Sequence, residues 1–224
     1  MVIKKGDFVE IDFIGRVKEG NHIFDLTKKS VAEKEGIVNK NAAYSPKIIC
    51  VGNGDVVKGL DNFLEGKEIG KKYEFNVSIE EGFGRKDAKL IKMLSLNVFK
   101  KQNLRPFPGL QIDIDGAYGT VRTVSGGRVL VDFNHPLSGK ELNYEIEINK
   151  LITDDTEKVK SVLKGMISKD IECSVKDGNA MIDLDLPEQY QKILAERIKK
   201  SVKSLKKVDF KKKELKKETV ETSK

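Results

Sequence analysis

Tryptophan is absent from this chain of 224 residues, and cysteine and histidine occur only twice each. Cys50 and Cys173 lie far apart in apolar alternating stretches, which is more typical of buried thiols than of a disulfide. Two isolated histidines, His22 and His135, without a Cys/His cluster argue against a metal site. We therefore expect neither a metal nor a cofactor.

Long apolar runs are also missing. No segment approaches 18 consecutive apolar residues, so a membrane-spanning helix is not expected. The first residues, MVIKKGDFVEIDF, alternate in polarity and lack the apolar centre of a signal peptide, which predicts a cytoplasmic location. A hydrophobic content of 38% beside 34% charged residues is typical of a globular protein, and the length allows more than one domain.

Arginine and aromatic residues are sparse in the most basic segment, Lys199 to Lys217. This segment contains ten lysines and only two acidic residues, so its net charge is +8, whereas the net charge of the whole chain is +7. Such a segment is one indication of a nucleic-acid or ribosome-associated protein. With Phe210 as its only aromatic residue, it is more typical of a solvated helix face followed by a frayed or disordered tail.

The stretch from Val51 to Gly84 carries the most specific pattern. Glycines interrupt a short apolar run before Leu60, which predicts a strand, a tight loop and a short helix near Gly59 to Leu64. Alternation from Lys72 to Ile79 predicts a further strand with one buried face.

Turn residues separate the other predicted elements. Residues 2 to 25 are expected to form a hairpin, and 28 to 46 an insertion that is helical up to Gly36 or a plain surface loop. A helical piece is expected near 98 to 102. Three alternating runs, at 110–114, 117–124 and 128–133, are joined by Asp-Gly and Ser-Gly-Gly turns.

The last 72 residues predict an α-β-β-α unit. An apolar stripe from Val159 to Ile167 marks one helix, two alternating runs around Asp177-Gly178 mark a hairpin, and Pro187 starts a second helix lined as far as Leu205. About 50 ordered residues give only a marginal core. We therefore expect 153–224 to self-associate, with a homodimer as the expected assembly.

Five blocks of this chain resemble the FKBP-type peptidyl-prolyl isomerases, and especially their SlyD-like branch. The blocks, in chain order, are GDFVEIDFIG with IFD, VGNGDVVKGL, EGKEIGKK, GFG, and NHPLSGK followed by the alternating Leu142 to Ile148. SlyD itself has a histidine-rich, metal-binding tail that this chain lacks. The added C-terminal region resembles that of the longer archaeal members of the family.

The resemblance implies an α+β fold in which a twisted antiparallel sheet wraps on a short helix. It implies a discontinuous isomerase domain at 1–85 plus 132–152, with a small β-rich chaperone domain, the insert-in-flap domain, at 86–131. The C-terminal α-β-β-α domain with its basic tail then occupies 153–224.

The resemblance also implies an apolar pocket. Isomerisation of an X-Pro bond breaks no covalent bond, so the catalyst has only to favour the twisted amide in a water-poor site with a few fixed hydrogen bonds. The residues implied as catalytic are Phe24, Asp25, Val57, Phe83 and Tyr144, and those implied as substrate-binding are Phe13, Ile49, Val56 and Leu60. The Val57 N–H is expected to bind a substrate carbonyl.

Two departures leave an alternative open. Phe13 and Phe83 stand where the family commonly has tyrosine, so a non-catalytic FKBP-fold scaffold is a competing interpretation.

In the inserted domain, apolar side chains exceed what a small core needs and predict a surface for unfolded or nascent polypeptides. The expected surface residues are Met93, Leu96, Phe99, Leu104, Phe107 and Leu110.

Overall fold

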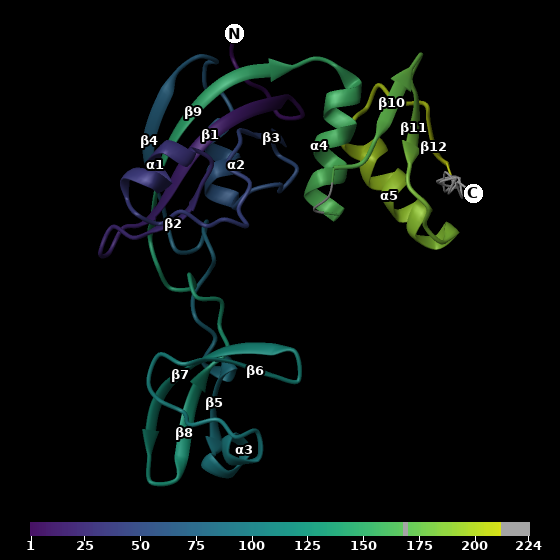
Figure 1. Cartoon of the computed structure of the whole chain (residues 1–224). Helices are drawn as coiled ribbons and strands as arrows, with labels where there is room; N and C mark the ends of the chain where they lie inside the picture. Colours follow the sequence, from purple (N-terminus) through teal and green to yellow (C-terminus); the bar gives the residue numbers. More distant parts are fainter. Residues whose placement is uncertain (168–169, 212–224) are drawn as a thin grey trace, which may run out of the picture. The chain divides into compact units, whose positions relative to one another are not determined.

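The computed structural model describes residues 1–167 and 170–211 as strands, helices and connecting loops (Figure 1). It has an α+β fold whose sheets are mainly antiparallel, as predicted. Its contacts divide the chain into two units. The first comprises Met1–Ile14, Asp25–Glu74 and the described part of Glu145–Lys224, and the second comprises Gly15–Phe24 and Phe75–Tyr144.

The largest sheet has the strand order β2-β1-β9-β4, with β3 paired to β1. Its strands are β1 (Phe8–Val17), β2 (Ile23–Leu26), β3 (Lys47–Cys50), β4 (Lys72–Val77) and β9 (Leu142–Ile152). Two short helices, α1 (Lys29–Lys34) and α2 (Lys58–Leu64), belong to the first unit. Ile3 is buried and Val2 is exposed.

A second sheet, of order β5-β8-β7-β6, lies wholly in the second unit. Its elements are a 3₁₀ turn (Ala88–Leu90), β5 (Ile91–Ser95), α3 (Leu96–Lys101), β6 (Gln111–Ile114), β7 (Ala117–Ser125) and β8 (Arg128–Asp132). Positive φ angles at Asp115, Gly116, Gly126 and Gly127 form the two hairpin turns, which is why Asp-Gly and Gly-Gly occur there. Phe99 fills the centre of this small core.

The C-terminal segment forms a third sheet, of order β10-β11-β12, with two helices packed on it (Figure 1). The elements are α4 (Asp155–Ile167), β10 (Cys173–Lys176), β11 (Asn179–Asp183), α5 (Glu188–Ser201) and β12 (Lys207–Lys211). The predicted α-β-β-α unit is therefore wrong by one strand. β12 pairs in parallel with β11 and packs Val208 and Phe210 against the core.

This C-terminal segment shares a hydrophobic core with the first strands of the chain. Phe8 and Cys50 pack in the same cluster as Val159, Leu163 and Ile198. All five residues are buried, and α4 packs directly against β3, so β1, β3, α4 and α5 contribute to one core. The basic stretch predicted at 199–217 is divided between the end of α5, a turn and β12, and its last residues, 212–217, lie outside the described residues.

Candidate active site

Three of the predicted catalytic side chains form an aromatic cluster in the second unit. Phe24 meets Phe83 edge to face, with ring centroids 6.2 Å apart and planes at 87°. It meets Tyr144 in the same way, at 5.8 Å and 89°. Gly15 makes this approach possible, because a Cβ atom there would lie 2.6 Å from the Phe24 ring. The cluster therefore depends on a glycine in β1.

Backbone and side-chain hydrogen bonds hold Phe83 in a tight turn. The N–H groups of Gly82 and Gly84 donate to the carbonyls of Ser78 and Ile79. The Ser138 hydroxyl donates to the Phe83 carbonyl at 3.1 Å. These bonds fix the direction of the ring on a segment without regular secondary structure.

His135 is a member of this cluster that the sequence interpretation missed. Its ring stacks on Phe83 with centroids 4.4 Å apart and planes within 3° of parallel. Its Nδ1 accepts a hydrogen bond from the Leu137 N–H, which orients the imidazole. The signal was present in the NHPLSGK block, but histidine was considered there only as a metal ligand.

The remaining predicted pocket residues belong to the first unit. Phe13, Ile49 and Leu60 are buried, and Val56 and Val57 are half-buried. Val57 precedes the first residue of α2, so its backbone lies at the start of that helix. The structure thus places these residues in the first unit, whereas Phe24, Phe83 and Tyr144 are in the second.

Asp25 occupies an exposed position in β2. Loss of hydration around its carboxyl raises its pKa, and the Lys47 ammonium and the Leu26 backbone amide oppose the rise. Within residues 1–167 and 170–211, no group of three or more His, Cys, Asp or Glu side chains could hold a metal ion. Cys50 and Cys173 are both free thiols.

A cleft of about 340 Å³ lies elsewhere on the first unit. Most of its lining is charged or polar, and Phe13 is the one predicted pocket residue in it. The lining residues are Asp12, Phe13, Ile14, Lys28, Lys72, Tyr73, Glu74, Glu145, Ile146 and Glu147. Because prolyl isomerisation needs an apolar, water-poor site, this charged cleft is not a candidate for it.

The predicted chaperone surface is only partly exposed. Met93 and Phe107 expose 61% and 57% of their area, and Leu104 is also exposed. Leu96 and Leu110 are half-buried against the sheet core. Phe99 is 1% exposed, so its assignment to the surface is wrong: α3 turns it into the core. Tyr118, 77% exposed on β7, was not predicted.

In the part of the chain that the structure describes, no helix is both long and apolar enough to cross a bilayer.

The chain matches two family models. FKBP-type peptidyl-prolyl cis-trans isomerase matches residues 2–100. FKBP26, IF domain, matches residues 92–137.

Three relatives show how far the similarity extends. A short-type peptidyl-prolyl cis-trans isomerase of Methanocaldococcus jannaschii is 30% identical over 156 residues, which are 70% of this chain and 98% of the relative. The FKBP-type isomerase SlyD of Haemophilus influenzae is 30% identical over 134 residues, covering 58% of this chain and 70% of SlyD. An FKBP-type 16 kDa isomerase of Escherichia coli is 28% identical over 107 residues, covering 46% and 72%.

Proposed function

Since the chain belongs to the FKBP-type peptidyl-prolyl cis-trans isomerase family, we propose that its substrates are X-Pro bonds of unfolded or nascent polypeptides. Its reaction is rotation about the X-Pro amide. The barrier arises from partial double-bond character, about 18–20 kcal/mol. No nucleophile or proton transfer is required, so the residues have only to bind the twisted amide better than the planar one.

The observation that carries this proposal is the edge-to-face cluster of Phe24, Phe83 and Tyr144. Aromatic rings fixed by mutual contact supply a preorganised apolar surface for a prolyl ring and keep water away from its amide. A carbonyl stripped of water has less charge separation, which lowers the double-bond character of the C–N bond. Phe13, Ile49, Val56 and Leu60 supply further apolar surface in substrate binding.

Two polar groups complete the proposed chemistry. The Val57 N–H, at the start of α2, donates to a substrate carbonyl, and the N-terminal end of a helix favours such an acceptor. The Asp25 carboxylate faces the region in which the carbonyl of the substrate amide rotates. Phe13 and Phe83 lack the hydroxyls that tyrosine would provide, which we expect to reduce substrate affinity without abolishing turnover.

A protease-coupled assay on an Ala-Leu-Pro-Phe-type peptide tests the proposal. We expect catalysed isomerisation that saturates weakly with peptide. A folded protein that leaves the uncatalysed rate unchanged would support the alternative of a non-catalytic FKBP-fold scaffold. A Phe83→Tyr variant sharpens the test, because restoring the hydroxyl should lower KM while the fold is retained.

For 86–131 we propose an inserted chaperone domain, in which Met93, Leu104 and Phe107 contact unfolded chains. Their exposure, and the match of residues 92–137 to the IF domain model, support this role. A flexible methionine beside an aromatic ring suits binding of many sequences. A surface of this kind next to a prolyl site raises the effective concentration of X-Pro bonds without a new catalytic group.

For 153–224 we propose an added domain, as in a long form of the family, that mediates self-association. Tyr190 and Ile193 on α5 and Met166 on α4 are exposed.

Nucleic-acid or ribosome contact is less well supported than the sequence suggested, because Val208 and Phe210 of the basic stretch pack into the core. A cytoplasmic location is also part of the proposal.

A further inference from the structure

The loop that joins β3 to α2, residues 51–57, is held by hydrogen bonds on two sides. From α2, the buried Asp61 carboxylate accepts the Gly52 N–H at Oδ1, 2.7 Å away, and the Gly54 N–H at Oδ2, 2.9 Å away. This anchor lies inside the isomerase fold and secures the two glycines on either side of Asn53. Both glycines have positive φ, so the loop needs them for its shape.

The second anchor comes from α5, more than 140 residues later in the chain. Arg197 Nη2 donates to the Asn53 carbonyl at 3.1 Å and lies 3.5 Å from Asp55 Oδ1. One turn further, the Ser201 hydroxyl accepts from Asn53 Nδ2 at 3.1 Å. Arg197 and Ser201 are four residues apart and therefore lie on one face of the helix.

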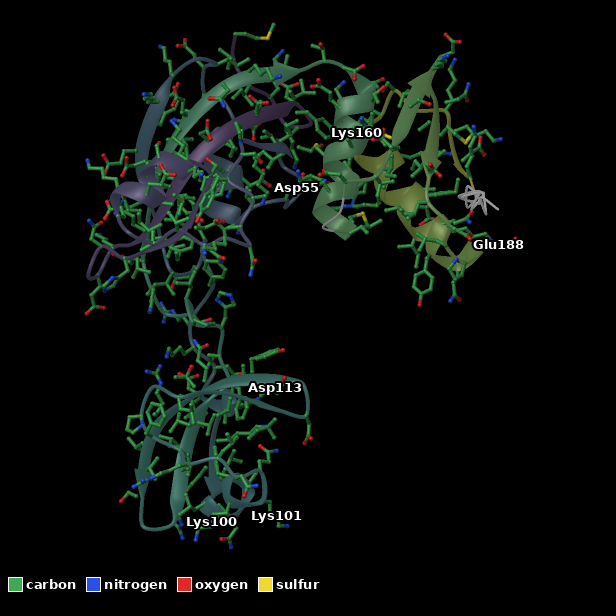
Figure 2. The ribbon with its side chains drawn as sticks, in the orientation of Figure 1. Asp55, Lys100, Lys101, Asp113, Lys160 and Glu188 are labelled. Atoms are coloured by element: carbon green, nitrogen blue, oxygen red, sulfur yellow. The ribbon has the colours of Figure 1, made fainter. Side chains whose placement is uncertain are left out.

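Asp55 connects these contacts to Val56 and Val57, which are predicted to bind substrate and to take part in catalysis, respectively. Its Oδ2 accepts the Cys50 N–H at 2.9 Å, and its Oδ1 accepts Asn53 Nδ2 at 3.1 Å (Asp55 is labelled in Figure 2). Val56 and Val57 follow Asp55 directly. A shift of Asp55 therefore moves the Val57 N–H, the proposed hydrogen-bond donor to substrate.

Three features make Arg197 effective in this place. Its helix is fixed to β1 and β3 through the shared core that contains Ile198 and Phe8. Its side chain is 36% exposed and that of Asp55 is 27% exposed, so the pair is partly shielded from water. A guanidinium can contact a carbonyl and a carboxylate together, because its donors form a rigid fork.

We propose that Arg197 is a positioning residue for isomerisation: through the Asn53 carbonyl and Asp55 it holds loop 51–57 so that the Val57 N–H meets the substrate carbonyl. This inference rests on the function proposed for Val57. It gives the C-terminal segment a part in catalysis, which the isomerase fold alone does not require. Arg197 itself does not touch the substrate.

The test compares full-length Arg197→Ala, Arg197→Lys and Lys200→Ala, where Lys200 is an exposed lysine of the same helix. We measure kcat and KM for the proline tetrapeptide at 25 °C, and the amide exchange of Gly52 and Gly54, whose N–H groups donate to Asp61. For Arg197→Ala we expect kcat/KM about threefold to tenfold lower, the range for one weakened hydrogen bond, and faster exchange in the loop. Arg197→Lys should recover part of both, and Lys200→Ala should match the wild type.

Each other outcome overturns the proposal at a known step. Faster loop exchange with unchanged kcat/KM means that the clamp exists but Val57 is not the substrate donor, so the proposed function of Val57 fails. Unchanged exchange and unchanged kcat/KM mean that Arg197 does not hold the loop. A lower melting temperature with normal kcat/KM shows a structural role only.

If Arg197→Ala does not fold, the Asp55→Asn variant tests the proposal instead. It keeps an acceptor for the Cys50 N–H but removes the charge that pairs with Arg197. The expected change is a smaller loss of kcat/KM with faster exchange at Gly52 and Gly54. A folded Asp55→Asn protein with wild-type values of both overturns the proposal.

Discussion

Replacement of Asp132 should destabilise the second unit measurably. Its side chain is only 4% exposed at the end of β8. Oδ2 accepts from Lys86 Nζ at 2.7 Å and from Arg122 at 2.7 and 3.1 Å. Oδ1 accepts from the Asn134 N–H at 3.0 Å and from its side-chain amide at 2.8 Å. One carboxylate thus joins β7, β8 and the two segments that enter and leave the small sheet.

Asp132→Asn retains the size of the side chain but replaces one oxygen by an NH₂ group. In one orientation the new NH₂ group faces the donors of Lys86 and Arg122, and in the other it faces the donors of Asn134. In both orientations a donor therefore faces donors. Hydrogen bonds to charged groups contribute about 1.5–3 kcal/mol each. Lys86 and Arg122 are about one third and one half exposed and regain water when they are released, so we expect a net loss of about 2 kcal/mol in unfolding free energy.

The pH dependence gives an independent check. Burial alone would raise the pKa of Asp132, but the hydrogen bonds from Lys86, Arg122 and Asn134 outweigh burial and hold it well below its ordinary value of 3.8. A carboxyl whose pKa falls on folding stabilises the protein above its unfolded pKa and loses that contribution as the pH falls towards the folded value. Stability should therefore decline below about pH 5, and less so in Asp132→Asn.

The measurement is a urea titration followed by the NMR resonances of Val129 and Val131, both buried in the small sheet. Asp113→Asn is the matched control, since Asp113, labelled in Figure 2, is exposed and its Oδ1 accepts the turn N–H of Gly116. Equal midpoints for the two variants at pH 7, or parallel acid profiles for Asp132→Asn and wild type, would refute the reasoning.

Three further outcomes are expected. Asp25→Ala should lower tetrapeptide turnover more than it lowers the melting temperature; unchanged turnover would remove Asp25 from the site. Met93→Ser with Phe107→Ser should leave tetrapeptide isomerisation near the wild-type rate but slow the catalysed, proline-limited refolding of a whole protein, and a loss of both would make the insert part of the pocket. Light scattering should show self-association of the full chain that Ile193→Asp abolishes, whereas a wild-type monomer at high micromolar concentration would contradict it.

Local sequence patterns were sufficient to predict a helix or strand wherever residues within the element and its flanking turns determine its conformation. The helix predicted near Gly59 to Leu64 and the strands around Asp115-Gly116 follow from turn chemistry and alternation, because both act within a few residues. The aromatic members of the site came from the family resemblance. Periodicity alone could not separate Phe24 from a core residue, since both are apolar at strand spacing.

Two errors came from interactions that are distant in sequence. β12 has an alternating pattern, Lys-Val-Asp-Phe-Lys, but its high charge favoured interpretation as a solvated helix face, and its parallel partner β11 is more than 20 residues away. Phe99 was judged by the surplus of apolar side chains in the insert. Which of them is buried depends on how α3 packs on the sheet, and Phe99 is the one that α3 directs inward.

The C-terminal segment was expected to be a domain with a marginal core of its own, and the core that it shares with β1 and β3 argues against testing it by deletion. A chain ending near residue 152 would expose Phe8 and Cys50, which are buried in one core with residues of α4 and α5. It would also remove both α5 contacts to Asn53. Loss of activity in such a truncated protein would therefore mix solvent exposure of an apolar face with release of loop 51–57. Single substitutions in the full chain separate these effects, because Arg197→Ala leaves the buried residues Leu194 and Ile198 of the same helix in place.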